Sequence, residues 1–147
     1  MSKVTPVVRL HFLVKFSLAS REELKAFMLS IFRKEKKALE SLNIVFCDDD
    51  HLLDLNRQFL KHDYYTDILS FRLSPPGKPL VGDIYISIDR VRDNAKNLNS
   101  SFKMELQRVV FHGILHFCGY KDKSAKDIRL MRNTEDKLLR AYALAKH

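Results

Sequence analysis

The chain has 147 residues, of which 46% are hydrophobic and 30% charged, and this size provides for one ordinary hydrophobic core in a single domain over residues 1–147. Cys47 and Cys118 lie too far apart for a zinc ribbon and are too few for a disulfide scaffold, so we expect reduced core residues. No apolar run is long enough for a signal peptide or a membrane span, which predicts a cytoplasmic protein with no membrane partner. The net charge of +8 divides into +5 in residues 1–41, −1 in 42–120 and +4 in 121–147. The basic ends could bind a polyanion or, with equal weight, could be a solvated surface that keeps the protein soluble.

The first predicted elements are a strand and a helix. Residues 7–16 alternate imperfectly between apolar and polar side chains, which indicates an edge strand. Apolar residues then recur at helical spacing and predict a helix from about residue 21 to the late thirties. Ser20 and Glu23 stand at its start with the spacing of a capping box.

A second strand and helix are predicted next. Residues 43–47 form a short apolar, β-rich run, and three aspartates, Asp48, Asp49 and Asp50, follow it. One of these aspartates is expected to cap a helix that begins near His51. A metal site is the weaker interpretation, because one turn cannot direct three short side chains at a single ion.

The rest of the chain predicts a hairpin followed by helices. Residues 67–73 and 80–88 are β-rich, and the turn-rich sequence SPPGKP between them indicates antiparallel pairing. The helices predicted after the hairpin cover residues 89–98, residues 102–118, and a segment from Ser124 or Asp127 to the last few residues.

The predicted helix over residues 102–118 carries two histidines. Near its C-terminal end, apolar or small residues occupy every side except the stripe that His112 and His116 share, and such a helix is normally buried. Imidazoles left unsatisfied there would cost roughly a few kcal/mol. Residues four apart lie one turn apart on the same face, so the two rings can converge on one cation. Gly113 costs helix stability and therefore indicates close approach of a neighbouring element.

The turn after this helix offers a third ligand. Gly119 stands where a C-terminal cap would be and allows the chain to turn back. Among Lys121, Asp122 and Lys123 only the carboxylate can ligate a metal, since a protonated lysine has no free lone pair. The pattern H-x3-H-x5-D then supplies two nitrogens and one oxygen and leaves a fourth position open for water. Two histidines four apart, taken without this context, are more often ordinary helix residues than a site.

Three sequence blocks occur in a fixed order: LNRQFLKHDYYTDILSF at residues 55–71, GDIYIS at 82–87 and HGILHFCGYKD at 112–122. They resemble the blocks LNxxYRxKDxPTDVLSF, GDIxIS and HGxLHLxGYDH of the YbeY family of bacterial endoribonucleases, also called ribosomal-RNA maturation factors. The residues that match the last block are His112, Gly113, Leu115, His116, Gly119 and Tyr120. Together the three blocks are highly specific.

The resemblance implies a zincin-like α+β fold, in which helices surround a small mixed four-stranded sheet and a buried central helix carries the metal-binding histidines. It implies one zinc ion (Zn2+) held by His112, His116 and Asp122. It also implies a metal-dependent, single-strand-type endoribonuclease whose partners are ribosomal RNA and the small ribosomal subunit, with roles in rRNA maturation and ribosome quality control.

The chain departs from the family pattern at two positions. Asp122 stands where the family has histidine; carboxylate is a competent zinc ligand, and its charge is expected to make a bound water less acidic. Lys121 and Lys123 could offset that charge or contact phosphate, or could be plain solvated lysines. Leu60 stands where the family has an arginine thought to handle substrate, and Arg57 is the candidate replacement.

The leading hypothesis is therefore metal-dependent hydrolysis of RNA, with no general base identified. Asp67 and Asp83 fall near strand ends, where hydrogen-bonding roles in the fold are expected for both. A zinc metallopeptidase is one alternative, disfavoured because Gly113 occupies the position of the peptidase glutamate. A non-catalytic ribosome assembly or RNA-binding factor with a structural metal is the other.

Overall fold

The computed structural model describes residues 5–145, and the two ends of the predicted domain, residues 1–4 and 146–147, lie outside the described residues. The elements in chain order are β1 (Val7–Phe12), α1 (Arg21–Lys34), β2 (Leu39–Cys47), α2 (Asp49–Leu60), β3 (Ile68–Arg72), β4 (Leu80–Ser87), α3 (Ile88–Asn97), α4 (Phe102–Phe117) and α5 (Ala125–Ala145). Within the described residues, no helix is both long and apolar enough to cross a membrane.

The strands form one mixed sheet in the order β1-β2-β4-β3. β1, β2 and β4 are parallel, whereas β3 runs antiparallel to β4 with Ile68 opposite Ile86 and Arg72 opposite Gly82. The predicted edge strand, the antiparallel hairpin and the mixed four-stranded sheet are therefore confirmed.

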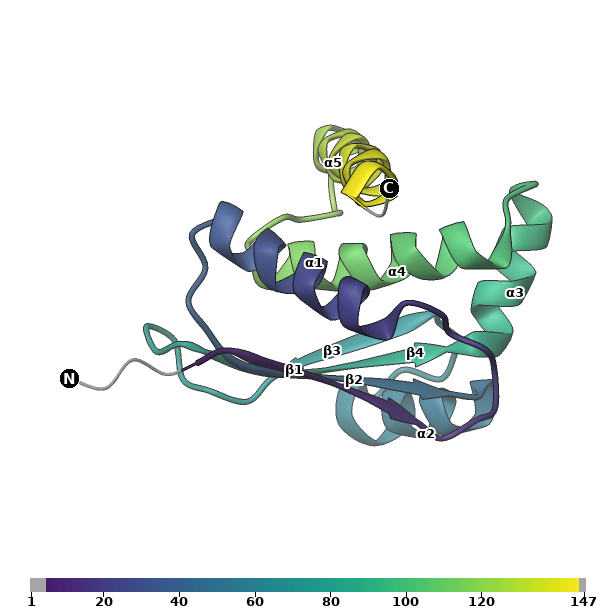
Figure 1. Ribbon diagram of the computed structural model, residues 1–147. Helices are drawn as coiled ribbons and strands as arrows, with labels where there is room; N and C mark the ends of the chain where they lie inside the picture. Colours follow the sequence, from purple (N-terminus) through teal and green to yellow (C-terminus); the bar gives the residue numbers. More distant parts are fainter. Residues whose placement is uncertain (1–4, 146–147) are drawn as a thin grey trace.

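The helices cover the sheet unequally. α1 and α4 lie on one face, α2 lies on the other, and α5 lies beyond α1 and α4, away from the sheet (Figure 1). Because side chains alternate along a strand, Leu42, Ile44 and Phe46 of β2 all point to the α1 and α4 side, where they are fully buried in the main core. A smaller cluster around Cys47 and Leu52 lies on the α2 side. α4 therefore lies between the sheet on one side and α5 on the other (Figure 1).

α4 packs very close to the sheet at Gly113. A Cβ atom placed on this glycine would lie 2.8 Å from Cδ1 of Ile68 and 3.0 Å from Cδ1 of Ile84. The close approach predicted from Gly113 is confirmed, and it brings the following turn of α4 down onto β3 and β4.

Several predicted boundaries differ from the structure. The first strand ends at Phe12, well before residue 16, and the first helix ends at Lys34 because Lys36 has a left-handed backbone (φ 56°) that no α-helix continues. The strand predicted from residue 43 begins at Leu39. The capping box is wrong: Ser20 precedes the helix, but at φ 58° rather than in the extended region of a capping serine, and its side chain makes no cap hydrogen bond.

Other local predictions hold. Asp48 is the aspartate that caps α2, since its side chain accepts a hydrogen bond of 2.8 Å from the His51 N–H. Both cysteines are free; Cys47 is fully buried, whereas Cys118 is only partly buried against the main core. Burial raises the pKa of Cys47 to about 12 and that of Cys118 to about 11, so both remain thiols at neutral pH.

Candidate metal centre

The two histidines of α4 lie at the edge of its buried surface. Phe111, Ile114 and Leu115 are fully buried, whereas the side chains of His112 and His116 are 24% and 33% exposed. The centroids of the two imidazole rings are 4.7 Å apart. The predicted convergence of both rings on one side of the helix is therefore confirmed.

The turn after α4 is a Schellman motif. The Tyr120 N–H donates to the Leu115 carbonyl at 3.0 Å, and the Gly119 N–H donates to the His116 carbonyl at 3.1 Å. Gly119 has φ +103°, in the left-handed region that favours glycine. This turn ends the helix and sends the chain back along it, as predicted from Gly119.

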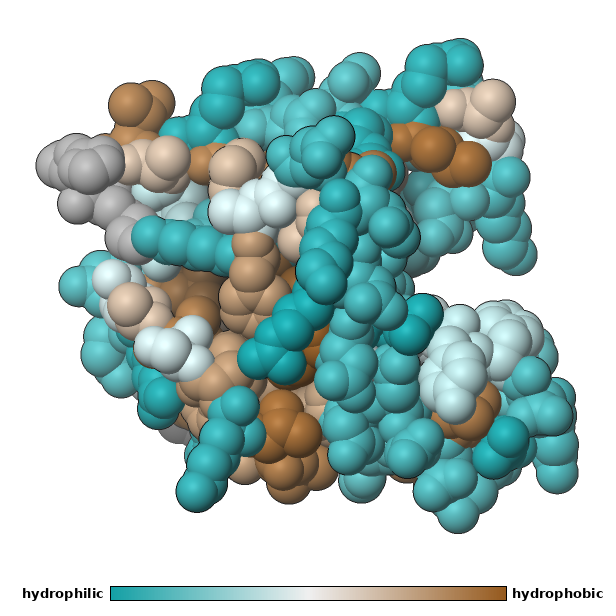
Figure 2. Space-filling view, turned by 90° about the vertical axis from the view of Figure 1, so that its right-hand side faces the viewer, coloured by the Kyte–Doolittle hydropathy of each residue, from teal (hydrophilic) through white to brown (hydrophobic). Residues whose placement is uncertain are grey.

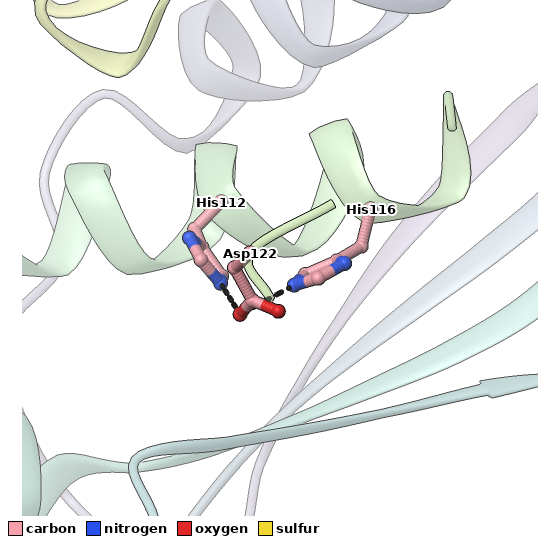
Figure 3. A group of neighbouring side chains, drawn as sticks. All are labelled: His112, His116 and Asp122. Atoms are coloured by element: carbon pink, nitrogen blue, oxygen red, sulfur yellow. Dashed lines mark hydrogen bonds and ion pairs between the residues drawn. The ribbon is translucent and has the colours of Figure 1, made fainter. Parts of the chain in front are cut away.

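The returning chain brings Asp122 between the two histidines (Figure 3). Its Oδ2 lies 3.2 Å from Nε2 of His116 and 3.7 Å from Nε2 of His112. Candidate ligand atoms of the three residues all lie within 4.8 Å of one another, and no other group of three potential ligands this close occurs in residues 5–145.

The spacing of these atoms suits a small divalent cation. Ligand atoms about 2.0–2.1 Å from a tetrahedral zinc ion are separated from each other by roughly 3.3 Å. The two distances to the Asp122 carboxylate fall on either side of that value. Nitrogen and carboxylate donors are also among those that zinc accepts. The residues present therefore fit a zinc ion.

A glutamate from α5 orients the first histidine. Nδ1 of His112 lies 2.7 Å from Oε2 of Glu135, whose side chain is only 4% exposed. A carboxylate only accepts, so Nδ1 carries a hydrogen; in the neutral form of the ring the free lone pair is then on Nε2, the nitrogen that faces Asp122. Burial lowers the pKa of His112, but the hydrogen bond and charge of Glu135 raise it more, so the pKa lies above its ordinary value.

Arg108 completes this buried network. Its guanidinium donates to Oε1 of Glu135 at 3.1 Å and to Oδ1 of Asp136 at 2.7 Å. Glu135 therefore bridges an arginine and a histidine, both from α4, and its buried charge is compensated.

Glu135 was missed by the sequence analysis, although a signal was present. The buried residues of α5 are Met131, Glu135, Leu139 and Tyr142, which recur at helical spacing. A charged residue on an otherwise apolar stripe needs a buried partner, and the two histidines of α4 were already candidates. The pairing itself depended on how α5 packs on α4.

A cleft of about 500 Å³ opens beside the triad, and Figure 2 shows a deep hollow on this side of the molecule. Its walls come from α3, α4 and α5, with Asp67 just before β3 and Asp122 in the turn after α4. The lining residues that carry its chemistry are Asp67, Asn94, Glu105, Arg108, His112, Asp122, Arg132 and Glu135. Burial raises the pKa of both Asp67 and Glu105.

The remaining predicted residues occupy different places. Asp83 accepts a hydrogen bond from Asn43 at 3.1 Å, the kind of role expected for it. Asp67 also accepts from an amide, that of Asn94 at 3.3 Å, but in addition it lines the cleft.

The three basic candidates for substrate contact are all exposed. Lys121 and Lys123 flank Asp122 in the turn. Arg57 lies on α2, paired with Asp63 and Asp54, and is not among the residues that line the cleft. Contact of these residues with substrate stays a prediction.

Comparison with known proteins gives one consistent family. The family model described as Endoribonuclease YbeY matches residues 14–143. A Cytophaga hutchinsonii protein named Endoribonuclease YbeY is 48% identical over 122 residues, which cover 83% of this chain and 85% of that protein. A Flavobacterium psychrophilum protein of the same name is 42% identical over 136 residues, 92% of this chain and 96% of that one.

A solved structure agrees with these relatives. The solution structure of TM1509 from Thermotoga maritima is similar with a TM-score of 0.65 and 30% sequence identity, covering 92% of this chain and 88% of that one. The matching sequence blocks, the shared fold and the extent of the match all agree, and the chain belongs to the YbeY family.

Proposed function

We propose that this protein is a zinc-dependent endoribonuclease that cleaves single-stranded RNA. Its expected partners are ribosomal RNA and the small ribosomal subunit, and its expected roles are rRNA maturation and ribosome quality control in the cytoplasm. Two lines of support are the name Endoribonuclease carried by the relatives and the location of the triad at the edge of a polar cleft.

The observation that carries the proposal is the orientation of His112. Glu135 holds its Nδ1 while Nε2 faces Asp122, and this arrangement recurs where a histidine ligates a metal. A zinc ion held by His112, His116 and Asp122 would supply a Lewis acid beside a bound phosphodiester.

Basic residues around the triad support contact with a phosphate backbone. Arg132 lines the cleft with its side chain exposed, and Lys121 and Lys123 flank Asp122. Positive side chains here would attract the strand and counter the charge that develops during cleavage. Arg108 is different, because its guanidinium is already bound to Glu135 and Asp136 and serves to hold Glu135 in place.

Two carboxyl groups could move protons in the cleft. Asp67 and Glu105 both line it, and burial raises the pKa of each toward neutral pH, where an acid–base group is most effective. We assign neither as the general base, because neither makes a contact that distinguishes it.

The test is cleavage of an unstructured RNA oligonucleotide and of purified small-subunit rRNA by zinc-loaded protein. Wild type is expected to cleave, and His116→Ala and Asp122→Ala are expected to lose both cleavage and bound zinc while keeping the circular dichroism of the fold. Asp50→Ala serves as the matched control, since Asp50 is an exposed aspartate of α2 outside the triad.

Two results would favour the alternatives. Cleavage of casein but not of RNA would indicate a metallopeptidase. Tight RNA binding without cleavage under any metal, together with unfolding of His116→Ala, would indicate an assembly factor with a structural metal.

A further inference from the structure

We propose that an exposed aromatic segment beside the cleft is a stacking platform for unpaired RNA bases. The platform consists of Tyr64 and Tyr65, in the loop between α2 and β3. Phe59, near the end of α2, is a third exposed ring, but it packs edge-on against Phe71 with centroids 5.8 Å apart. This inference rests on the proposed function, because it takes single-stranded RNA as the ligand of the adjacent cleft. It adds a base-binding subsite to that cleft.

The three rings stand out by their exposure. Phe59 is 62% exposed, Tyr64 57% and Tyr65 51%, and no other phenylalanine or tyrosine in residues 5–145 belongs to the exposed class. The chain has ten phenylalanines and five tyrosines, so nearly all its aromatic side chains are at least partly buried. Two adjacent tyrosines that stay this exposed, when most other rings are buried at least in part, indicate a binding surface.

The loop that carries the tyrosines is held in place. Asn56 is buried; its side-chain Nδ2 donates to the Tyr64 backbone carbonyl at 2.9 Å, and its backbone carbonyl accepts from the His62 N–H at 3.2 Å. The Tyr64 ring stacks on His62 with centroids 5.1 Å apart and an interplanar angle of 20°, and the two side chains also share a hydrogen bond of 2.9 Å. The ring is therefore ordered before any ligand arrives, which reduces the entropic cost of binding.

One face of α3 connects the platform to the cleft. The guanidinium of Arg90 lies 5.5 Å from the centroid of the Tyr65 ring. Asn94 and Asn97, further along α3, line the cleft, and Asn94 donates to Asp67, two residues after Tyr65. Residues four apart share a helix face, so a strand leaving the cleft along this face of α3 would meet Tyr65.

The two arginines near the platform are paired within the protein. Arg57 is bound to Asp54 and Asp63, and Arg90 is bound to Asp49 and Asp93. Apart from the exposed Lys61, the platform therefore offers ring surface more than free positive charge. Ring surface matches nucleobases, which stack on aromatic side chains with little regard to sequence, better than it matches phosphate.

The test measures the affinity of the full-length protein for an unstructured RNA oligonucleotide. Fluorescence anisotropy gives this affinity at several salt concentrations, and a gel checks that the RNA remains intact. The Tyr64→Ala/Tyr65→Ala double variant is expected to bind about tenfold more weakly than wild type. Its slope of log affinity against log salt is expected to equal that of wild type, because no phosphate contact is lost.

Matched variants separate stacking from other effects. Replacing both tyrosines by Phe should preserve the affinity, and replacing both by Leu should lose it, since leucine is apolar but cannot stack. Leu144→Ala, at another strongly exposed apolar position, should bind as wild type. An RNA of the same length that carries abasic sites should bind wild type and the double variant equally.

Three results would overturn the platform: unchanged affinity of the double variant, a reduced salt slope, or a dimer in sedimentation that these substitutions dissociate, which would make the patch a contact between copies. The platform and the proposed function fail separately. Cleavage by a double variant that binds RNA normally removes only the platform, whereas weakened binding by a protein that never cleaves RNA removes only the nuclease.

Discussion

The two sides of α4 differ in the kind of contact they make. Toward the sheet, Ile114 is fully buried and Gly113 lies so close to β3 and β4 that a Cβ there would press on Ile68 and Ile84. Toward α5 and the cleft, the same helix presents Glu105, Arg108 and the two histidines. The first side is apolar packing, and the second is a network of buried and half-buried charges.

This difference separates stability from chemistry. Apolar packing stabilises in proportion to the surface removed from water and depends little on which partner provides it. A buried charged network is tolerated only when each member has its partner, as Glu135 has Arg108 and His112. We therefore expect substitutions on the sheet side to change the free energy of unfolding, and substitutions on the other side to change metal affinity.

The largest expected effect is on the sheet side. Ile114→Ala would leave a cavity in the main core and is expected to lower the free energy of unfolding by about 2–5 kcal/mol. Urea denaturation measures this loss. Zinc bound per folded molecule should equal that of wild type, and a parallel loss of zinc from folded protein would show that the two sides are not separable.

The next effect is at the triad. Asp122→Ala removes a candidate ligand and is expected to weaken zinc binding by about 100-fold or more, beyond the usual range for residues outside the ligand set. Asp122→His, which restores the family residue, should keep zinc bound. Competition with a chromophoric chelator measures both. Unchanged zinc affinity of the alanine variant would remove Asp122 from the site.

A smaller effect on zinc affinity is expected at Glu135, which contacts a candidate ligand but is not one itself. Glu135→Gln removes the charge that orients His112, and zinc affinity is expected to fall about 10- to 100-fold with the ligands intact. Asp136→Asn is the matched control, because Asp136 binds Arg108 but is not a partner of His112. Equal losses in the two variants would point to a general loosening of α5.

The smallest effect concerns pH. Burial raises the pKa of Glu105, so the folded state favours the protonated carboxyl over the carboxylate. The stability that this group contributes is therefore fully present below its unfolded pKa. That stability is lost as pH rises through the folded pKa. Glu105→Gln should therefore be more stable than wild type at neutral pH by a small margin that disappears near pH 4. Urea denaturation at both pH values checks this, and Glu22→Gln, at a highly exposed position, should show no such trend.

Much of the site could be predicted because it is local in sequence. His112, His116, Gly119 and Asp122 lie within eleven residues, and helical spacing plus one Schellman turn is enough to bring them together. The order and type of the strands and helices also followed from periodicity and turn residues. The predicted capping box and C-terminal end of α1 were less accurate, because a left-handed backbone angle at Ser20 and at Lys36 decides how this helix begins and where it ends.

The residues around the triad could not be predicted in the same way. Glu135 reaches His112 across 23 positions of the chain, and Asp67 reaches Asn94 across 27. Such contacts depend on how α5 and β3 pack against α3 and α4, and spacing along the chain does not encode that packing. The sequence by itself therefore determined the family, the helix that carries the histidines and the third candidate ligand. Only the tertiary structure decided which buried carboxylate orients His112, where the cleft opens and which exposed rings lie beside it, because these features join segments far apart in the chain.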